Sequence, residues 1–141
     1  MNIKLASNEV IHFIGIGGIG MSGLALVMKN MGFKVQGSDV NFNQSIGRLK
    51  KLGINIFIGH KHKNLKNSTV VVISSAIKSN NLELKFAKKN KLPIYKRGDM
   101  LAHIVSLKKN IVITGSHGKT TTTSLISSIL YASKFDATVI N

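Results

Sequence analysis

The stretch that decides the fold is VIHFIGIGGIGMSGLA, at residues 10–25. It opens with a short, mostly apolar run that stops at Gly15, which predicts a buried strand. From Met21 onward, apolar residues recur at helical spacing as far as Gly32, a residue type that commonly follows a helix. Between the predicted strand and helix lies G-x-G-x-x-G, the glycine pattern of a dinucleotide-binding βα turn.

Three glycines of this pattern have distinct expected roles. Gly15 would permit the tight turn, Gly17 would let the backbone approach a pyrophosphate, and Gly20 would let the helix pack closely on the strand. Asp39, nineteen residues after Gly20, ends the next predicted strand. In dinucleotide enzymes an acid at this place accepts hydrogen bonds from the ribose hydroxyls, so the residues alone leave an NAD-binding module open.

Small polar residues follow the most apolar predicted strand, STVVVISSA at 68–76. Ligands of open α/β sheets bind outside the carboxyl ends of the strands, where Ser74 and Ser75 would lie. Together with the bare amide of Gly18, these hydroxyls would suit a diphosphate. The alternative, that the two serines simply end the strand, also stays open.

Strands and helices alternate along the whole chain. We expect further strands at 33–39, 54–59, 92–96, 111–115 and 138–140, and helices at 43–53, 81–90, 97–107 and from the second glycine loop to about residue 131. Such alternation predicts an α/β fold with a parallel sheet. We therefore predict a Rossmann-like domain over 1–107, followed over 108–141 by the first βα unit of a P-loop ATPase domain.

The second glycine loop is GSHGKTTTT, at 115–123. The usual phosphate loop is G-x-x-x-x-G-K-[ST], and here Gly115 precedes Gly118 by only three residues. The two glycines would bend the backbone so that its N–H groups face phosphate oxygens. Lys119 would supply a positive charge for the β- and γ-phosphates, and the Thr120 hydroxyl could ligate Mg²⁺.

Charge and composition narrow the classes of partner. The formal net charge is +15, but nearly all basic residues are scattered lysines without interleaved aromatic residues, so nucleic-acid binding is not favoured. The positive field favours anionic ligands such as nucleotides. The chain has no cysteine, which excludes disulfides and fits a reducing cytosol, and it has no apolar run that suits a signal peptide or a membrane span. We expect a cytoplasmic protein that binds neither nucleic acid nor membrane.

Four segments, taken together and in order, resemble the Mur ligases: HFIGIGGIGMSGLA at 12–25, GSD at 37–39, VVVISSAI at 70–77 and GSHGKTTTT at 115–123. The resemblance covers essentially the whole chain. It implies that the first domain binds the UDP of UDP-N-acetylmuramate rather than NAD. The residues that it places at this substrate are Gly15, Gly17, Gly18, Gly20, Asp39, Ser74 and Ser75.

The resemblance also implies an ATP site and an activity. The ATP-binding residues would be Gly115, Ser116, His117, Gly118, Lys119, Thr120 and Thr121, with Lys119 and Thr120 catalytic and Thr120 a Mg²⁺ ligand. His117 would either touch phosphate or only shape the loop. The implied reaction joins L-alanine to the carboxylate of UDP-N-acetylmuramate: ATP converts the carboxylate to an acyl phosphate, and the amine then displaces phosphate.

Mur ligases have a central ATPase domain and a C-terminal domain that binds the amino acid. The resemblance therefore implies that this chain is an N-terminal fragment, with the base pocket, further metal ligands and the amino-acid site beyond Asn141. We expect weak or absent ATP hydrolysis by the chain alone. Two other hypotheses stay open: an NAD-binding regulatory module, and a small basic nucleic-acid-binding protein.

Overall fold

The structure, a computed structural model, describes residues 3–139. Contacts between Cα atoms divide the chain into two compact units, Met1–Ile104 and Val105–Asn141. Each unit is described by itself below.

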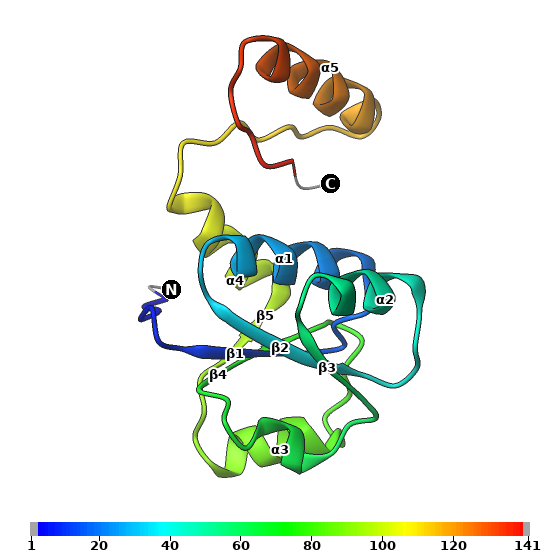
Figure 1. The fold of residues 1–141 in the computed structure, drawn as a ribbon, viewed down its shortest axis with the longest axis vertical. Helices are drawn as coiled ribbons and strands as arrows, with labels where there is room; N and C mark the ends of the chain where they lie inside the picture. Colours follow the sequence, from blue (N-terminus) through cyan, green and yellow to red (C-terminus); the bar gives the residue numbers. More distant parts are fainter. Residues whose placement is uncertain (1–2, 140–141) are drawn as a thin grey trace. The chain divides into compact units, whose positions relative to one another are not determined.

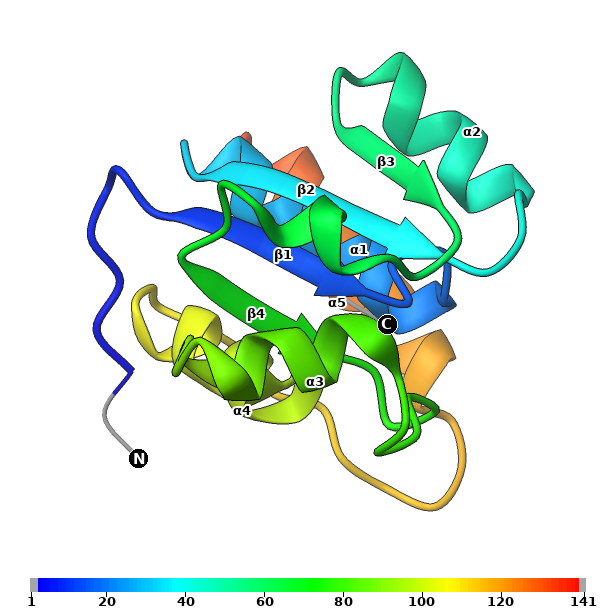
Figure 2. The same ribbon diagram turned by 90° about the horizontal axis from the view of Figure 1, so that it is seen from below.

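The first unit is built on a five-stranded parallel sheet (Figures 1 and 2). Its strand order is β3-β2-β1-β4-β5, so the chain reverses its direction of travel between β1 and β4. In open α/β sheets this switch point opens a crevice at the carboxyl ends of the strands. The predicted α/β fold with a parallel sheet is confirmed. The strands are β1 (Val10–Ile14), β2 (Lys34–Asp39), β3 (Asn55–Ile58), β4 (Val70–Ile73) and β5 (Ile94–Lys96).

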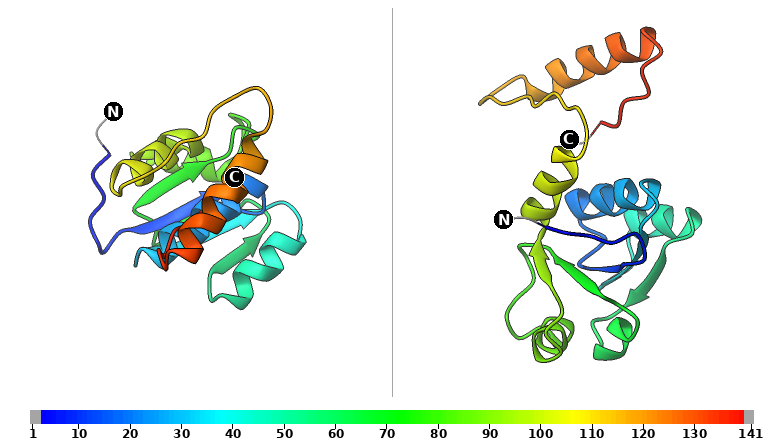
Figure 3. Two further views of the ribbon diagram at one scale, coloured as in Figure 1. Left: turned by 90° about the horizontal axis from the view of Figure 1, so that it is seen from above. Right: turned by 90° about the vertical axis from the view of Figure 1, so that its left-hand side faces the viewer.

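Helices cover both faces of the sheet, with α1, α2 and α4 on one face and α3 on the other (Figure 3). The predicted helices form with bounds shifted by one or two residues, α1 beginning two residues before Met21, and a short 3₁₀ helix, η1, was not predicted. The bounds are α1 (Ile19–Asn30), α2 (Gln44–Lys51), η1 (His62–Leu65), α3 (Leu82–Lys89) and α4 (Arg97–Ser106).

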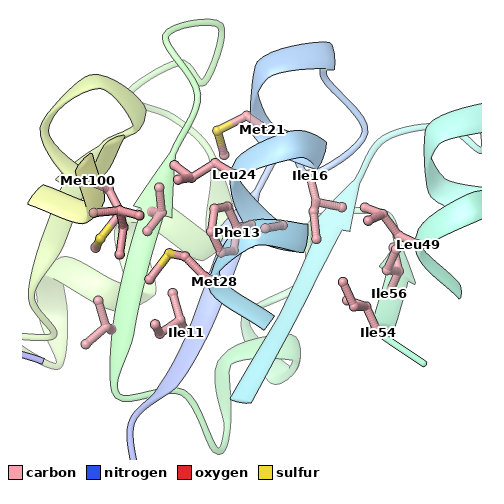
Figure 4. Packing of buried hydrophobic residues seen from close by; sticks show 14 of the residues in the cluster. Ile11, Phe13, Ile16, Met21, Leu24, Met28, Leu49, Ile54, Ile56 and Met100 are labelled. Atoms are coloured by element: carbon pink, nitrogen blue, oxygen red, sulfur yellow. The ribbon is translucent and has the colours of Figure 1, made fainter. Parts of the chain in front are cut away.

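The larger core lies between the sheet and α1, where successive β1 residues alternate between faces. Ile11 and Phe13 pack with Leu24 and Met28 of α1 and are fully buried (Figure 4). Ile14 belongs instead to a smaller cluster that includes α3. Burial of β1 on both faces explains why its apolar run is nearly continuous.

In the second unit, the two strand predictions do not hold for the described residues. No strand forms at 111–115, and residues 138–139 are not in a strand either; residue 140 lies outside the described residues. The apolar run at 111–115 has no neighbouring strand within the described part of this unit, and a strand needs such a partner for its backbone hydrogen bonds. The predicted helix does form as α5 (Lys119–Ala132), but none of its residues is buried.

Candidate functional site

The residues predicted around the first glycine loop converge at the carboxyl end of the sheet. Gly15 follows β1, Asp39 ends β2 and Ser74 follows β4. Gly15 has a φ of +84°, and a Cβ built there would lie 3.3 Å from the Ser74 Cβ. A side chain on Gly15 would therefore be both strained and crowded, as the predicted tight turn requires.

Main-chain amides of the loop are already paired within the protein. The Gly15 and Ile16 amides donate to the Ser38 carbonyl at 2.8 and 3.0 Å, and the Gly18 amide donates to the Gly15 carbonyl at 3.3 Å. The Gly17 amide donates to Asp39 Oδ2 at 2.8 Å. A phosphate at this loop therefore has to find its donors elsewhere.

The second glycine of the pattern makes room for polar side chains of the protein itself. A Cβ on Gly17 would lie 2.7 Å from Asn43 Nδ2 and 2.9 Å from Asp39 Oδ2. Asn43 Nδ2 donates to the Gly17 carbonyl at 3.1 Å, while the Asn43 side chain also caps α2 through the Ile46 amide. The missing side chain of Gly17 thus makes room for the contacts that join the loop to the segment after β2, and its approach to a pyrophosphate stays a prediction.

Asp39 holds the loop from the end of β2. One carboxylate oxygen accepts the Gly17 amide, and the other accepts the Val40 amide at 2.7 Å. Its side chain is only half-buried, so a ligand can still reach it. The structure therefore places Asp39 at the end of β2 and beside the loop, with part of its acceptor capacity already in use.

Unpaired main-chain N–H donors lie directly after the loop, in the first turn of α1. Gly18 is the N-cap and makes no side-chain cap, and the first turn contains no acidic residue. Among the described residues, no group accepts from the amides of Ile19, Gly20 or Met21, whereas the Ser22 amide donates to the Gly18 carbonyl at 2.8 Å. Unpaired N–H groups and the positive end of the helix dipole favour an anion here.

The two serines after β4 differ from each other. Ser74 is half-buried beside Gly15, and its Oγ accepts the Ala76 amide at 3.2 Å. Ser75 is exposed. Both lie at the switch point between β1 and β4, where the sequence placed them.

The second glycine loop differs from the first because its main-chain amides are unpaired. Gly118, with a φ of +75°, is the N-cap of α5, and Lys119 Nζ donates to the Gly115 carbonyl at 2.7 Å. In the described part of the chain, no group accepts from the amides of residues 116–121. Every residue from Gly115 to Thr121 is exposed. The loop thus offers a row of open donors beside one positive charge.

The model of the Mur ligase family, catalytic domain, matches residues 10–109. The chain belongs to the Mur ligase family. It is 67% identical, over all 141 residues, to the UDP-N-acetylmuramate–L-alanine ligase of Pelagibacter ubique, and 53% identical over 133 residues to that of Rickettsia felis. It covers 30% and 28% of the length of these two relatives, so it corresponds to less than a third of each.

Solved Mur ligases have the same fold. The chain matches UDP-N-acetylmuramate–alanine ligase from Thermotoga maritima with a TM-score of 0.81 and 35% identity, over 88% of this chain and 29% of that one. It matches the UDP-N-acetylmuramate:L-alanyl-γ-D-glutamyl-meso-diaminopimelate ligase from Neisseria meningitides with a TM-score of 0.80 and 31% identity, over 89% of this chain and 40% of that one. No helix among residues 3–139 is long and apolar enough to cross a membrane.

This Mur ligase chain also contains a buried polar network around Glu83 of α3, which the sequence analysis did not predict. The Glu83 carboxylate is fully buried and accepts from Ser38 Oγ at 2.5 Å and from Asn64 Nδ2 at 2.6 Å. His60 Nδ1 lies 3.1 Å from Glu83 Oε2, and His12 Nε2 lies 3.5 Å from the same oxygen. The contributing residues come from two strands, two helices and the loop after β3, so no local pattern could have predicted the cluster.

This network holds the same strand that anchors the glycine loop, because the Ser38 hydroxyl binds Glu83 while the Ser38 carbonyl accepts the loop amides. Burial raises the pKa of Glu83, but His12, Ser38 and Asn64 lower it by more, so the pKa lies below its usual value. Glu83 is therefore a buried carboxylate stabilised by its neighbours.

Proposed function

We propose that this chain is the UDP-sugar-binding part of a ligase that joins L-alanine to UDP-N-acetylmuramate at the expense of ATP. The observation that carries the proposal is the 67% identity, over the entire chain, to a protein of that name. The placement of the polar loop residues at the switch point of the sheet supports it.

The diphosphate of UDP-N-acetylmuramate would lie at the first turn of α1. Its oxygens would accept from the unpaired amides of residues 19–21, while Gly15, Gly17 and Gly18 shape the loop that leads there. Ser74 and Ser75 would approach the phosphates or the sugar, and Asp39 would lie near the uridine. Bare amides suit this ligand because they hold negative charge without a side chain in the way.

The loop at 115–121 would bind the ATP phosphates. Its open amides and the Lys119 ammonium fit such an anion, and Thr120 would contribute its hydroxyl to Mg²⁺. Among residues 3–139 no three His, Cys, Asp or Glu side chains gather at a place that could hold a metal ion. Mg²⁺ neutralises phosphate charge when it is bound.

In the whole protein, the muramoyl carboxylate would attack the γ-phosphate of ATP, forming an acyl phosphate and ADP. The amine of L-alanine would then displace phosphate, because an acyl phosphate is a far better electrophile than a carboxylate. The residues of this chain would contribute positioning: they hold the UDP end of one substrate and the phosphates of the other.

An NAD-binding module is the competing function. It would use the Asp39 carboxylate for the ribose hydroxyls, and part of the acceptor capacity of that carboxylate is taken by the Gly17 and Val40 amides. It also leaves the loop at 115–121 without a role.

Calorimetric titration of the chain with UDP-N-acetylmuramate, with NAD and with a DNA duplex tests the proposal. We expect heat of binding with the UDP-sugar and none with the other two. Tight NAD binding without a response to the UDP-sugar would overturn the proposal, and so would preference for the duplex.

A further inference from the structure

A buried carboxylate lies beside the strand that holds the first glycine loop. Glu83 belongs to α3, which covers the face of the sheet opposite α1, and its side chain is fully buried (Figure 3). It can therefore touch no ligand directly. Well-packed apolar residues often replace buried charges without loss of stability, so stability alone does not account for a carboxylate at this place.

The strand that leads into the loop also turns a donor towards this carboxylate. Gln36 Nε2 donates to the Asn64 carbonyl at 2.8 Å, which identifies it as the amide nitrogen, and it lies 3.1 Å from His12 Nδ1. Because an amide nitrogen only donates, His12 Nδ1 accepts and the His12 proton is on Nε2. That Nε2 has no hydrogen-bond partner among residues 3–139 and lies 3.5 Å from Glu83 Oε2. Glu83 thus attracts an N–H of β1, three residues before Gly15.

Ser38 joins the carboxylate to the loop, because its side chain binds one and its main chain the other. Ser38 Oγ donates to Glu83 Oε2 at 2.5 Å. The Ser38 carbonyl accepts from the amides of Gly15 and Ile16 at 2.8 and 3.0 Å. A shift of Ser38 therefore moves the acceptor that fixes the start of the loop, and with it the path of the chain into α1.

The carboxylate also restrains β2 from the side of β3. Asn64 Nδ2 donates to Glu83 Oε1 at 2.6 Å and to the Gly59 carbonyl at 3.0 Å. The Gly59 amide in turn donates to the Asp39 carbonyl at 2.7 Å. One carboxylate thus restrains both Ser38 and Asp39, the two residues of β2 that accept amides of the loop.

We propose that Glu83 is a positioning residue for the UDP-sugar: acting through Ser38, it sets the path of the first glycine loop and thereby the affinity for UDP-N-acetylmuramate, without touching that ligand. The inference rests on the proposed function, because it assigns a further residue to the same site. Substitutions that act on a site without ligand contact change affinity by about 2- to 30-fold, and an effect of this size is expected here.

A double-mutant cycle tests the link through Ser38. Calorimetric titrations with UDP-N-acetylmuramate, at neutral pH and well below the melting temperatures, compare the parent with Glu83→Gln, Ser38→Ala and the double variant. Each single substitution should weaken binding by about 2- to 30-fold. The double variant should bind no more weakly than the weaker single variant, because both substitutions break the same hydrogen bond. Glu9→Gln is the matched control: it removes a carboxylate just before β1, at the end of the strand away from the loop, and should bind as the parent does.

Amide hydrogen exchange separates positioning from a general loss of stability. In either single variant, the Gly15 and Ile16 amides should exchange faster relative to the Gly53 and Ile54 amides, which donate to carbonyls of α2. A merely structural role would speed exchange evenly across the first unit, because global unfolding exposes every amide. Even acceleration would therefore overturn the assignment.

The outcomes separate the two proposals. If the parent binds the UDP-sugar and both single variants bind it as tightly, or if their losses multiply in the double variant, the role of Glu83 is wrong while the proposed function stands. If the parent does not bind the UDP-sugar, the proposed function is overturned and exchange decides on the positioning of the loop. Selective acceleration at Gly15 and Ile16 would then support that positioning, and even acceleration would refute it.

Discussion

The two glycine loops of this chain differ in what holds them. In the first loop the amides of residues 15–18 are bonded to the protein, two of them to the Ser38 carbonyl and one to Asp39. In the second loop the amides of residues 116–121 are unpaired within the described chain, and the side-chain bond from Lys119 to the Gly115 carbonyl is local. Similar glycine-rich sequences thus give a braced loop in one case and an open one in the other.

The difference follows from the surroundings of each loop. The first loop leaves a strand that is buried on both faces, so neighbouring strands and helices reach it from several directions. The second precedes a helix with no buried residue and follows a segment that forms no strand. A loop forms hydrogen bonds to distant parts of the sequence when a packed core surrounds it. The described part of the second unit has no buried core around its loop, so only contacts between near neighbours in sequence remain.

The largest effect is expected on the free energy of unfolding, when a buried side chain of the first unit is compared with an exposed one of the second. Phe13→Ala removes a fully buried ring and should lower the free energy of unfolding by about 3–5 kcal/mol. Leu125→Ala, on α5, removes a side chain that is 62% exposed and should change that free energy by at most about 0.5 kcal/mol. Urea unfolding followed by circular dichroism measures both, and equal losses would contradict the contrast between the units.

A smaller effect is expected from the bracing of the first loop. Gly17→Ala forces a Cβ against Asn43 and Asp39, and overpacking of this kind costs about 1–3 kcal/mol of stability. Gly118→Ala in the second loop meets no atom within 4 Å, but the φ of +75° strains an alanine there. Because this strain arises in the second unit, the unfolding of the first unit should not change. The urea midpoints of the two variants test whether the loops are independent. Loss of stability of the first unit in Gly118→Ala would show that they are not.

The independence of the two ligand sites can be tested through the open loop. Lys119→Ala should weaken ATP binding by about 10- to 100-fold, because a charge-assisted hydrogen bond to phosphate is lost. UDP-N-acetylmuramate affinity and the melting temperature should stay unchanged. Parallel calorimetric titrations give both affinities, and an equal loss of both ligands would refute the assignment of one nucleotide to each loop.

The smallest effect concerns the buried carboxylate that braces β2. The folded pKa of Glu83 lies below its usual value of 4.5, so its contribution to stability is present above about pH 4.5 and is lost as the pH falls towards the folded pKa. Glu83→Gln should therefore be less stable than the parent at neutral pH, and the difference should shrink in acid.

Melting temperatures between pH 7 and pH 3 measure this dependence. Asp99→Asn changes an exposed carboxylate that forms no ion pair with a described residue, so it should follow the profile of the parent. A constant gap between Glu83→Gln and the parent at every pH would show that the charge of Glu83 does not stabilise the fold.

The prediction of the Rossmann-like sheet from sequence depended on features that are local by nature. An apolar run that ends at Gly15 and a helical repeat that ends at Gly32 are set by backbone sterics and by burial, so the order of strands and helices could be predicted. The run at 111–115 had the same local pattern and formed no strand, because pairing requires a neighbour that sequence periodicity does not report.

The sequence by itself determined that two phosphate-binding patterns exist, since glycine spacing and a following helix encode the exposed amides directly. Only the tertiary structure decided which amides stay free in the first loop and which side chains surround it. Ser38, Asn43, Glu83 and Arg97 reach the loop or its anchoring strand from segments far apart in the chain, and their contacts exist only when the sheet has brought those segments together.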